Sequence, residues 1–328
     1  MFGIFSRSKT QTEPFVNSGP VMSTVVYQKI YGINGADAAE NVSRELQRID
    51  SLWSPSFPGN IIDNIRRCSG ISALSADKDT VNICRQAKTF GMLSRGAFDI
   101  TSDPLIRLWR EAAQKKSPPS PDEIKKARDL ICKDDLQIGQ DKTISLARIG
   151  QGIDLGGIGK GYAADRCKRI YQDAGVKHAV VNIGGNVLVM NSKPDGSPWK
   201  IGIKDPRDKN GKLIGFIEAV DCSVVTSGDY ERFFDYIDCN NKIKRFHHIL
   251  DPRTGYPVET DIASVTVISD SSCLCDALST AAFVLGKEEG MKLCSQFDNT
   301  SFLFIDKNGN IEMNGELIVK FTRGDPDD

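Results

Sequence analysis

The stretch DLGGIGKGYAADR at residues 154–166 combines residue types that suit one kind of chemistry, the binding of an anion. It contains four glycines and Lys160, and it leads into an apolar pattern typical of a helix start. A glycine turn that enters a helix exposes backbone N–H groups, and the helix dipole favours a negative charge there. We therefore expect a phosphate site to which Lys160 adds a charge. A tight turn with closely packed glycines and a solvated lysine explains the stretch equally well.

The spacing of this stretch excludes two common nucleotide-binding motifs. A Walker A loop needs a glycine five positions before Gly159 and a serine or threonine after Lys160, but the chain has Asp154 and Gly161 there. A dinucleotide fingerprint needs G-x-G-x-x-G, whereas the glycines from Gly157 onward are spaced G-x-G-x-G. The expected phosphate site belongs to neither class.

Two later segments also offer polar groups to a ligand. In NIGGNVLVM, Gly184 and Gly185 end a strand-like run, where backbone can approach a ligand closely. In VVTSGDYERFF, the Thr-Ser-Gly-Asp sequence at residues 226–229, which includes Ser227, is expected to form a turn.

The segment FHHILDPRTGYPV holds two of the three histidines of the chain, His247 and His248, followed by Asp251. Adjacent residues of a strand point to opposite faces, so one of the two rings is expected to be structural, and we assign that role to His247.

The segment CDALSTAAFVLG places Asp276 and Thr280 four residues apart, on one face of an expected helix. A carboxylate and a hydroxyl that point the same way suit Mg²⁺, which commonly keeps waters and substrate phosphates as its other ligands. Alternatively, the Thr280 hydroxyl bonds back to a carbonyl of its own helix.

The order of these patterns predicts an α+β protein. Residues 36–53 place Ala39, Val42, Leu46 and Ile49 at helical spacing, and residues 77–100 and 117–131 form two further helical patterns. From about residue 142, short apolar runs divided by Gly, Asp and Pro predict strands, with helices only after Lys160 and over residues 275–286. We expect a mixed, largely antiparallel sheet covered by helices.

Composition excludes several classes of function. The 328 residues include 42 basic and 43 acidic side chains, so no long-range field draws the chain to nucleic acid or to an anionic membrane. Its nine cysteines show no CxxC spacing and suit a reducing compartment. As the sequence stands we expect a cytoplasmic protein with no membrane segment; an export or anchoring leader that precedes it would change this expectation.

Taken in order, these segments resemble the ApbE family, the FAD:protein FMN transferases, over nearly the whole chain. VMSTVVY is similar to the family's M-G-T strand, RGAFDIT to its G-x-F-D-x-T turn, and DLGGIGKGYAAD to its D-L-G-G-I-A-K-G-Y signature. NIGGN, TSGDYERFF, HHILDPRTGYP and DALSTAAFVLG follow in the family's order. Seven segments in register make the resemblance specific.

The resemblance implies Mg²⁺-dependent cleavage of FAD, transfer of FMN to a threonine or serine hydroxyl of an acceptor flavoprotein, and release of AMP. The acceptor would carry a D-x-x-T/S-G-A-T/S motif, which this chain lacks, so it would be another chain. The implied architecture is ApbE-like and T-fold-related, with a flexible tail over residues 1–20 and a single domain over residues 21–328 that has a helical insertion around residues 76–135.

The resemblance also implies roles for particular residues. The Mg²⁺ ligands would be Asp276 and Thr280, joined by backbone around Gly157 and Ser279. The FAD contacts would be Met22, Ala97, Phe98, Asp99, Asp154, Lys160 and Leu250, with Gly184, Gly185 and Ser227 as further candidates. His248 would be the catalytic base, because imidazole is suited to proton transfer near neutral pH, with Asp251 either orienting it or shaping the turn.

Departures from the family pattern leave some roles open. The family's S-T-Y-x-P-x-S segment is replaced by SLWSPSFPGNIIDNI, so either Trp53 or Phe57 is a candidate to stack on a ring of FAD. Two other functions use the same residues: hydrolysis of FAD to FMN and AMP, and FAD binding without catalysis.

Overall fold

An eight-stranded sheet forms the centre of the molecule. The structure, a computed structural model, describes residues 13–208, 210–230, 233–237, 243–317 and 319–324. Every pair of neighbouring strands in the sheet is antiparallel. In spatial order the strands are β1 (Phe15–Val21), β2 (Thr24–Tyr31), β6 (His178–Ile183), β7 (Asn186–Met190), β10 (Ser223–Gly228), β13 (Ile262–Ser269), β14 (Ser301–Asp306) and β15 (Ile311–Gly315). The expected α+β class with a largely antiparallel sheet is confirmed.

The central strands of this sheet are buried on both faces, and their successive side chains, which point to opposite sides, enter two different cores. In β6, Val181 packs into a core shared with helices, whereas its neighbour Val180 packs into a second core. In β14, Phe304 and Leu303 divide in the same way. Burial on both faces explains why β13 is buried at every position.

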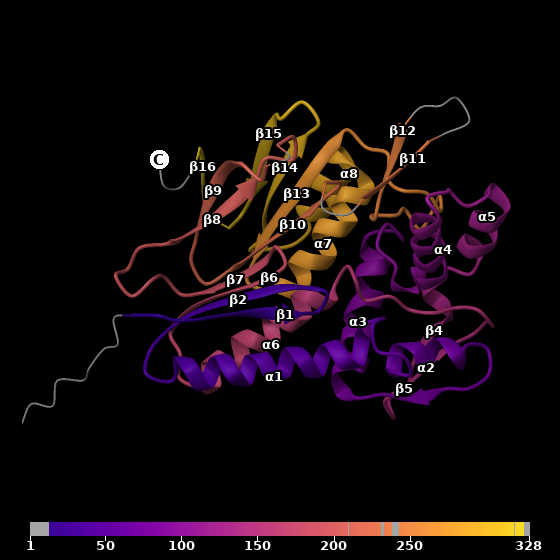
Figure 1. The fold of residues 1–328 in the computed structure, drawn as a ribbon, viewed down its shortest axis with the longest axis horizontal. Coiled ribbons are helices and arrows are strands. Elements are labelled where there is room, and N and C mark those ends of the chain that lie inside the picture. Colours follow the sequence, from indigo (N-terminus) through magenta and orange to yellow (C-terminus); the bar gives the residue numbers. More distant parts are fainter. Residues whose placement is uncertain (1–12, 209, 231–232, 238–242, 318, 325–328) are drawn as a thin grey trace, which may run out of the picture.

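Four helices are associated with one face of the sheet (Figure 1): α1 (Gly35–Trp53), α6 (Gly159–Asp173), α7 (Ser272–Leu285) and α8 (Lys287–Cys294). Helix α1 contacts β1 and β2, α6 contacts β6 and β7, and α7 contacts β10 and β13. The predicted helical spacing in α1 is confirmed, since Ala39, Val42, Leu46 and Ile49 are all buried.

A three-stranded sheet covers the other face. Its strands, in spatial order, are β16 (Lys320–Arg323), β9 (Leu213–Ala219) and β8 (Trp199–Lys204). Trp199 and Ile217 of this sheet share the second core with Val180 and Ile305 of the large sheet.

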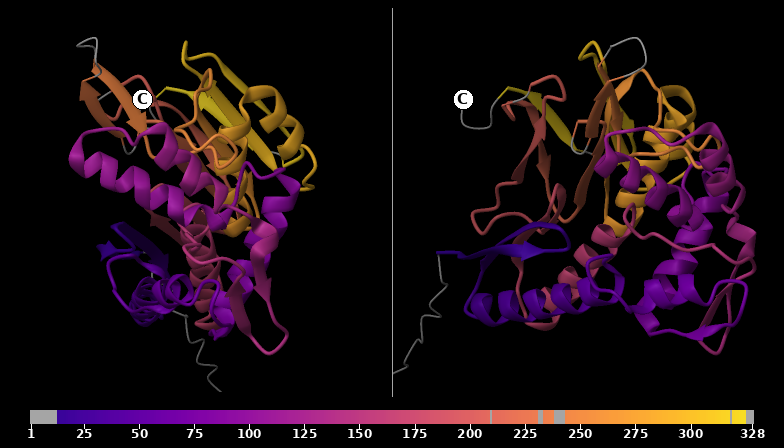
Figure 2. Two further views of the ribbon diagram at one scale, coloured as in Figure 1. Left: turned by 90° about the vertical axis from the view of Figure 1, so that its right-hand side faces the viewer. Right: turned by 45° about the vertical axis from the view of Figure 1, so that its right-hand side comes forward.

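A helical segment lies beside this layered body, at the right in Figure 1 and toward the viewer in the left panel of Figure 2. Its helices are α2 (Ile61–Arg67), α3 (Lys78–Leu93), α4 (Asp103–Lys115) and α5 (Pro121–Asp129), with single turns η1 (Ile100–Ser102) and η2 (Lys133–Asp135). A small sheet of β3 (Leu74–Ser75), β5 (Thr143–Leu146) and β4 (Leu136–Ile138) accompanies them.

A two-stranded ribbon, β11 (Phe233–Ile237) with β12 (Ile243–His247), packs against α4. The ring of Trp109 lies 4.8 Å from that of Phe246 and 6.5 Å from that of Phe234, so aromatic contacts hold the ribbon to this helix.

Some expected elements differ from the structure. Residues 15–20, expected in the tail, belong to β1, which pairs along its length with β2; residues 1–12 lie outside the described residues. Residues 226–228, expected in a turn, end strand β10, where Thr226 pairs with Thr266 and their hydroxyls hydrogen-bond at 2.8 Å. Cross-strand pairing here outweighs a turn-like composition. Helices α2, α4 and α8 were not predicted.

Across the described ranges, no helix has both the length and the apolar character that a bilayer crossing requires.

We expect Gly161→Ala to destabilise the contact between α6 and α7. A Cβ at this position would lie 2.3 Å from the Ser272 carbonyl oxygen and 2.8 Å from the Asp276 Cβ. Overpacking costs about 1–3 kcal/mol, which exceeds the gain of up to about 1 kcal/mol from replacing a helical glycine. Urea unfolding should show a lower midpoint. Gly19→Ala, where the added carbon has nothing within 4 Å, is the control and should change the midpoint little. Equal midpoints for the two variants would contradict the expected crowding.

Candidate active site

A large cleft lies where the layered body meets the helical segment. Its volume is about 1070 Å³, and its walls come from segments far apart in the sequence, from Met22 to Thr280. Pockets for drug-sized ligands are about 300–1,000 Å³. The cleft therefore has room for a dinucleotide-sized ligand and part of a second molecule.

The floor of the cleft is built where α6 and α7 meet. The Asp276 carboxylate, on a residue only 3% exposed, accepts a hydrogen bond from the Gly161 backbone N–H at 2.9 Å through Oδ2. Its Oδ1 lies 3.5 Å from the Lys160 ammonium group. The glycine at 161 is what lets α6 approach α7 closely enough for this bond. The glycine loop, Lys160 and Asp276 thus form one unit at the floor of the cleft.

Oxygen groups surround Thr280, one turn after Asp276. The Ser227 hydroxyl lies 3.4 Å from the Thr280 hydroxyl and 2.9 Å from that of Ser279, which donates to the Asp276 carbonyl at 3.1 Å. A Cβ on Gly157 would lie 3.4 Å from the Thr280 hydroxyl oxygen, so the loop backbone lies against this side chain. Within the residues that the structure describes, no group of three His, Cys, Asp or Glu side chains could hold a metal.

The oxygen donors at the floor fit Mg²⁺. One buried carboxylate, a hydroxyl one helical turn away and nearby loop backbone are hard oxygen ligands, and Mg²⁺ needs few of them because it keeps waters and phosphate oxygens. The ligand that the resemblance implies near Ser279 is backbone; the Ser279 hydroxyl is buried with two partners, and Ser279 is not among the residues that line the cleft.

Two further carboxylates line the cleft next to the glycine loop. Asp154 accepts a hydrogen bond from the Gly156 N–H at 2.7 Å, and its own N–H donates to the Ile100 carbonyl at 2.8 Å. Asp99 accepts from the backbone N–H and the hydroxyl of Thr101. Burial raises the pKa of both Asp154 and Asp99 above the ordinary value of aspartate.

Two hairpin turns present backbone to the cleft. Gly184 and Gly185 have φ values of 57° and 90° and connect β6 to β7 in a two-residue loop. Met22 and Ser23 connect β1 to β2 with φ values of 54° and 57°, which side-chain-bearing residues rarely adopt. Both turns line the cleft, and Thr24 lies between them against Gly184.

The two adjacent histidines have different environments. The His247 ring accepts a hydrogen bond from the Ile249 N–H through Nδ1 and contacts the Val258 carbonyl through Nε2 at 2.8 Å, a network that assigns the proton to Nε2. Its ring packs edge-on against Phe283, and burial lowers its pKa. These contacts are those of a structural histidine. His248 also lines the cleft and is exposed.

Asp251 forms hydrogen bonds within the turn that follows His248. Its two carboxylate oxygens each lie 2.9 Å from the Arg253 guanidinium, and Oδ1 also accepts the Arg253 backbone N–H. Asp251 is not among the residues that line the cleft. Of the two roles expected for it, shaping the turn agrees with these contacts.

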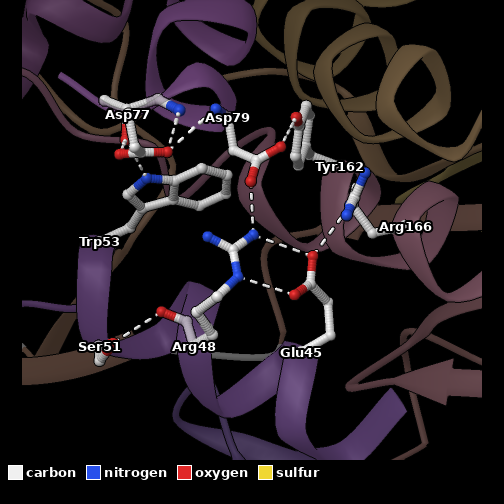
Figure 3. Close-up of polar contacts among 9 residues, drawn as sticks. Glu45, Arg48, Ser51, Trp53, Asp77, Asp79, Tyr162 and Arg166 are labelled. Carbon is white, nitrogen blue, oxygen red and sulfur yellow. Dashed lines mark hydrogen bonds and ion pairs between the residues drawn. The ribbon is translucent and has the colours of Figure 1, made fainter. Parts of the chain in front are cut away.

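A polar network fixes one aromatic wall of the cleft (Figure 3). The Trp53 indole N–H donates to the buried hydroxyl of Thr80 at 2.9 Å, and its ring meets that of Tyr162 edge-on at 5.3 Å. The Tyr162 hydroxyl donates to Asp79, which is ion-paired with Arg48. Helices α1, α3 and α6 are thereby joined at the point where α6 leaves the glycine loop.

The same network extends through Glu45, which pairs with Arg48 at 2.7 Å and with Arg166 at 2.9 Å. In Figure 3 these charged groups lie side by side between the helices, while Trp53 is held by its indole N–H bond to Thr80 and by its ring contact with Tyr162.

Comparison with known proteins agrees with this geometry. The sequence model of the ApbE family matches residues 21–304. The chain belongs to the ApbE family. A relative from Klebsiella pneumoniae, named FAD:protein FMN transferase, is 32% identical over 307 residues that cover 93% of each chain. A protein of the same name from Treponema pallidum is 30% identical over 314 residues, 92% of this chain and 85% of that one.

Solved ApbE structures share the fold. The ApbE protein of Thermotoga maritima superposes with a TM-score of 0.82 at 31% identity, covering 92% of this chain and 96% of that one. The flavin transferase ApbE of Vibrio cholerae superposes with a TM-score of 0.81 at 26% identity, covering 93% and 98%.

In this ApbE-family chain, all but two of the residues expected in the site line one cleft. The exceptions are Ser279 and Asp251; those that line it are Met22, Ala97, Phe98, Asp99, Asp154, Gly157, Lys160, Gly184, Gly185, Ser227, His248, Leu250, Asp276 and Thr280. Trp53 and Phe57, between which the sequence left the choice open, both line it.

Sequence reasoning missed a basic contribution to the walls. Arg66 and Arg67 on α2 and Arg110 on α4 also line the cleft. The spacing of Ile106, Arg110 and Ala113, at intervals of four and three residues, could have predicted that these side chains share one face of a helix.

Asp154→Asn should stabilise the chain at pH 7.5 in the absence of metal and FAD. The pKa of Asp154 is raised in the folded chain, so the free energy of unfolding falls as pH rises from the ordinary aspartate value of about 4 through the raised value. Asparagine does not ionise and removes this fall, so the advantage of the variant should shrink toward pH 4. Urea titrations of wild type and variant at pH 7.5 and at pH 4 measure this difference in the free energy of unfolding.

Asp195→Asn is the control for this measurement. Hydrogen bonds from Ser197 lower the pKa of Asp195, so its replacement should bring no gain at pH 7.5. An Asp154→Asn variant that unfolds more easily than wild type at pH 7.5 would contradict the prediction.

Proposed function

We propose that this ApbE-family chain transfers FMN from FAD to a threonine or serine hydroxyl of an acceptor flavoprotein and releases AMP. The observation that carries the proposal is the convergence of Lys160, Asp276, Thr280 and the glycine loop on one cleft that also contains His248. The relatives named FAD:protein FMN transferase, which match over nearly the whole chain, support it.

In the proposed site, Asp276 and Thr280 hold Mg²⁺ together with loop backbone at Gly157. When bound, Mg²⁺ neutralises charge on the pyrophosphate oxygens as the phosphorus centre reacts. Lys160 contributes a second positive charge beside the loop, at the positive end of the α6 dipole. The Gly161 bond to Asp276 fixes the carboxylate relative to that helix start.

His248 takes the proton of the attacking hydroxyl in this scheme. The acceptor oxygen then forms a bond to the FMN phosphorus, the bond from that phosphorus to the bridging oxygen breaks, and AMP leaves with the bridging oxygen. An imidazole has an ordinary pKa of about 6.5 and is therefore available as a base near neutral pH. His247 serves instead to hold the strand end in place through its bonds to Ile249 and Val258.

The remaining cleft residues are proposed to hold FAD. Phe98, Ala97 and Leu250 offer apolar surface, and Asp99 and Asp154 offer hydrogen-bond acceptors. The two hairpin turns would add polar contacts to FAD through backbone at Met22, Gly184 and Gly185. The end of β10 would add one through the Ser227 hydroxyl. The acceptor is proposed to carry the D-x-x-T/S-G-A-T/S motif.

The assay that tests the proposal supplies FAD with and without Mg²⁺, alone and with an acceptor domain that carries the motif. Covalent flavin is read as fluorescence on a denaturing gel and AMP is quantified in solution. Mg²⁺-dependent labelling with release of AMP is the expected result. AMP without labelled acceptor would indicate FAD hydrolysis, and FAD binding with neither product would indicate a binding protein.

Asp276→Asn and Thr280→Val should each lower the transfer rate by roughly 100-fold or more, because metal stabilisation of charge is worth several kcal/mol and each 1.4 kcal/mol is tenfold. Both changes keep side-chain shape, and asparagine still offers an oxygen to the Gly161 N–H. Titration with Mg²⁺ should show weaker binding. Asp270→Ala, an exposed aspartate just before α7, is the control. Full activity in both site variants would remove them from the metal site.

His248→Ala should lower transfer by about 10²- to 10⁴-fold, the usual range for loss of a general base, while FAD affinity stays close to that of wild type. The pH profile of the residual activity should lose its acidic limb. His178→Ala tests a histidine outside the cleft, whose Nδ1 contacts the Ser192 carbonyl. A His248→Ala variant that transfers at the wild-type rate would exclude this residue as the base.

A further inference from the structure

Arginines border the cleft on the side formed by α2 and α4. Arg66, Arg67 and Arg110, hereafter the arginine rim, all line the cleft. The side chains of Arg66 and Arg67 are 35% and 66% exposed, and Arg110 is exposed as well. The rim is thus open to solvent, in contrast to the floor around Asp276.

The carboxylates that accompany these arginines lie deeper. Asp63 pairs with Arg66 and, at 2.9 Å, with Arg67, and its side chain is only 11% exposed. Asp103 pairs with Arg107 at 2.9 Å and approaches Arg66 at 4.0 Å, and its side chain is 10% exposed. The outward-facing ends of this cluster are therefore guanidinium groups.

The residues of α2 and α4 that line the cleft carry a small excess of positive charge. They are the three arginines of the rim and two aspartates, Asp63 and Asp103. The other charged groups of the lining are mostly carboxylates, Asp50, Asp99, Asp154 and Asp276 with Lys160, so the excess of positive charge is confined to this side of the cleft.

Arg110 is distinctive within this cluster. Among the lysines and arginines that line the cleft in the described part of the chain, it alone forms no ion pair within 4 Å, whereas Arg66, Arg67 and Lys160 each have a carboxylate partner. An exposed guanidinium that forms no ion pair within 4 Å can bind a carboxylate of another molecule.

A protein substrate would enter the same cleft that the arginine rim lines. The floor residues and His248 lie in this cleft, so an acceptor segment that brings a hydroxyl to them comes close to the rim. Exposed aromatic rings also line the cleft, Phe57 at 44% and Phe233 at 46% exposure. Arginine and aromatic residues are the types enriched in protein interfaces.

We propose that the arginine rim is a docking surface for an acidic segment of the acceptor protein, which Arg67 and Arg110 bind through charge-assisted hydrogen bonds. This inference rests on the proposed transfer of FMN to a protein. The rim selects acceptors whose residues around the modified hydroxyl are acidic, and it raises the rate of their association, as charges at an interface border do.

The test measures binding of an acceptor domain directly, by calorimetry with FAD present and Mg²⁺ absent, so that no transfer is needed. The probe is a domain that carries the D-x-x-T/S-G-A-T/S motif with acidic flanking residues, alongside the same domain with those residues changed to Asn and Gln. The chain variant is Arg67→Glu with Arg110→Glu. The control is Lys115→Glu, a charge reversal of the same kind at a single residue of α4 that does not line the cleft.

We expect the double variant to weaken binding of the acidic domain by about tenfold or more at low salt, and the neutralised domain to bind wild type equally weakly. High salt should reduce this difference, because it screens exposed charges. Acceptor domains with Arg in place of the acidic flanking residues should regain affinity for the double variant. FAD affinity, measured by flavin fluorescence, should stay within about twofold.

Two results would overturn the proposal. Equal affinity of wild type and double variant for the acidic domain would show that the rim does not contact the acceptor. A loss of FAD affinity of tenfold or more would show that these arginines bind the dinucleotide instead. Failure of the transferase proposal would be seen in a different measurement. In that case the wild-type chain would bind the acceptor domain but would not label it with flavin under any condition.

Discussion

The hydrogen bond from the Gly161 N–H to the buried Asp276 carboxylate joins the two helices on which the cleft depends. Helix α6 carries the glycine loop and Lys160 at its start, and α7 carries Asp276 and Thr280. A buried carboxylate is costly without partners, and here a backbone N–H and a nearby ammonium group supply them. The bond exists only because a residue without a side chain stands at 161. Loop, cation and carboxylate therefore keep a fixed geometry before any ligand arrives.

The layered sheet explains why that geometry is rigid. Helix α7 lies against β10 and β13, and both faces of this part of the sheet are covered, by helices on one side and by the three-stranded sheet on the other. Close-packed interiors resist displacement. The helical segment shares this core through α3, where Val81 and Ala87 are buried with residues of α1 and α7, and the charged network around Arg48 adds polar contacts. Aromatic contacts of Trp109 hold α4 to the β11–β12 ribbon, so this wall of the cleft combines core packing with polar and aromatic contacts.

Much of this could be predicted from local pattern. The apolar spacing of α1 follows from burial of one helical face, and the strand-like run of β13, in which valine and isoleucine alternate with small or hydroxyl residues, follows from burial of both strand faces. The cleft residues could be named because their short motifs follow one another in a family's order. Helix α4 was missed although Leu105, Trp109 and Ala112 have helical spacing, since it begins directly after a turn with no linker to mark its start. The end of β10 was misplaced because pairing with β13 is a tertiary effect that a Thr-Ser-Gly-Asp composition does not reveal.

The arginines of α2 and α4 could not be grouped from sequence, since about forty residues separate them and only the packed structure brings them to one border. The two hairpin turns line the cleft in a different way. At Gly184–Gly185 the chain has only backbone to offer to the cleft, and the neighbouring turn Met22–Ser23 has positive φ angles of the same kind. A backbone group stays the same when side chains change, as long as the unusual dihedral angles persist. This tolerance suits a fold that is shared with the Vibrio cholerae structure at a TM-score of 0.81 although only 26% of the residues are identical.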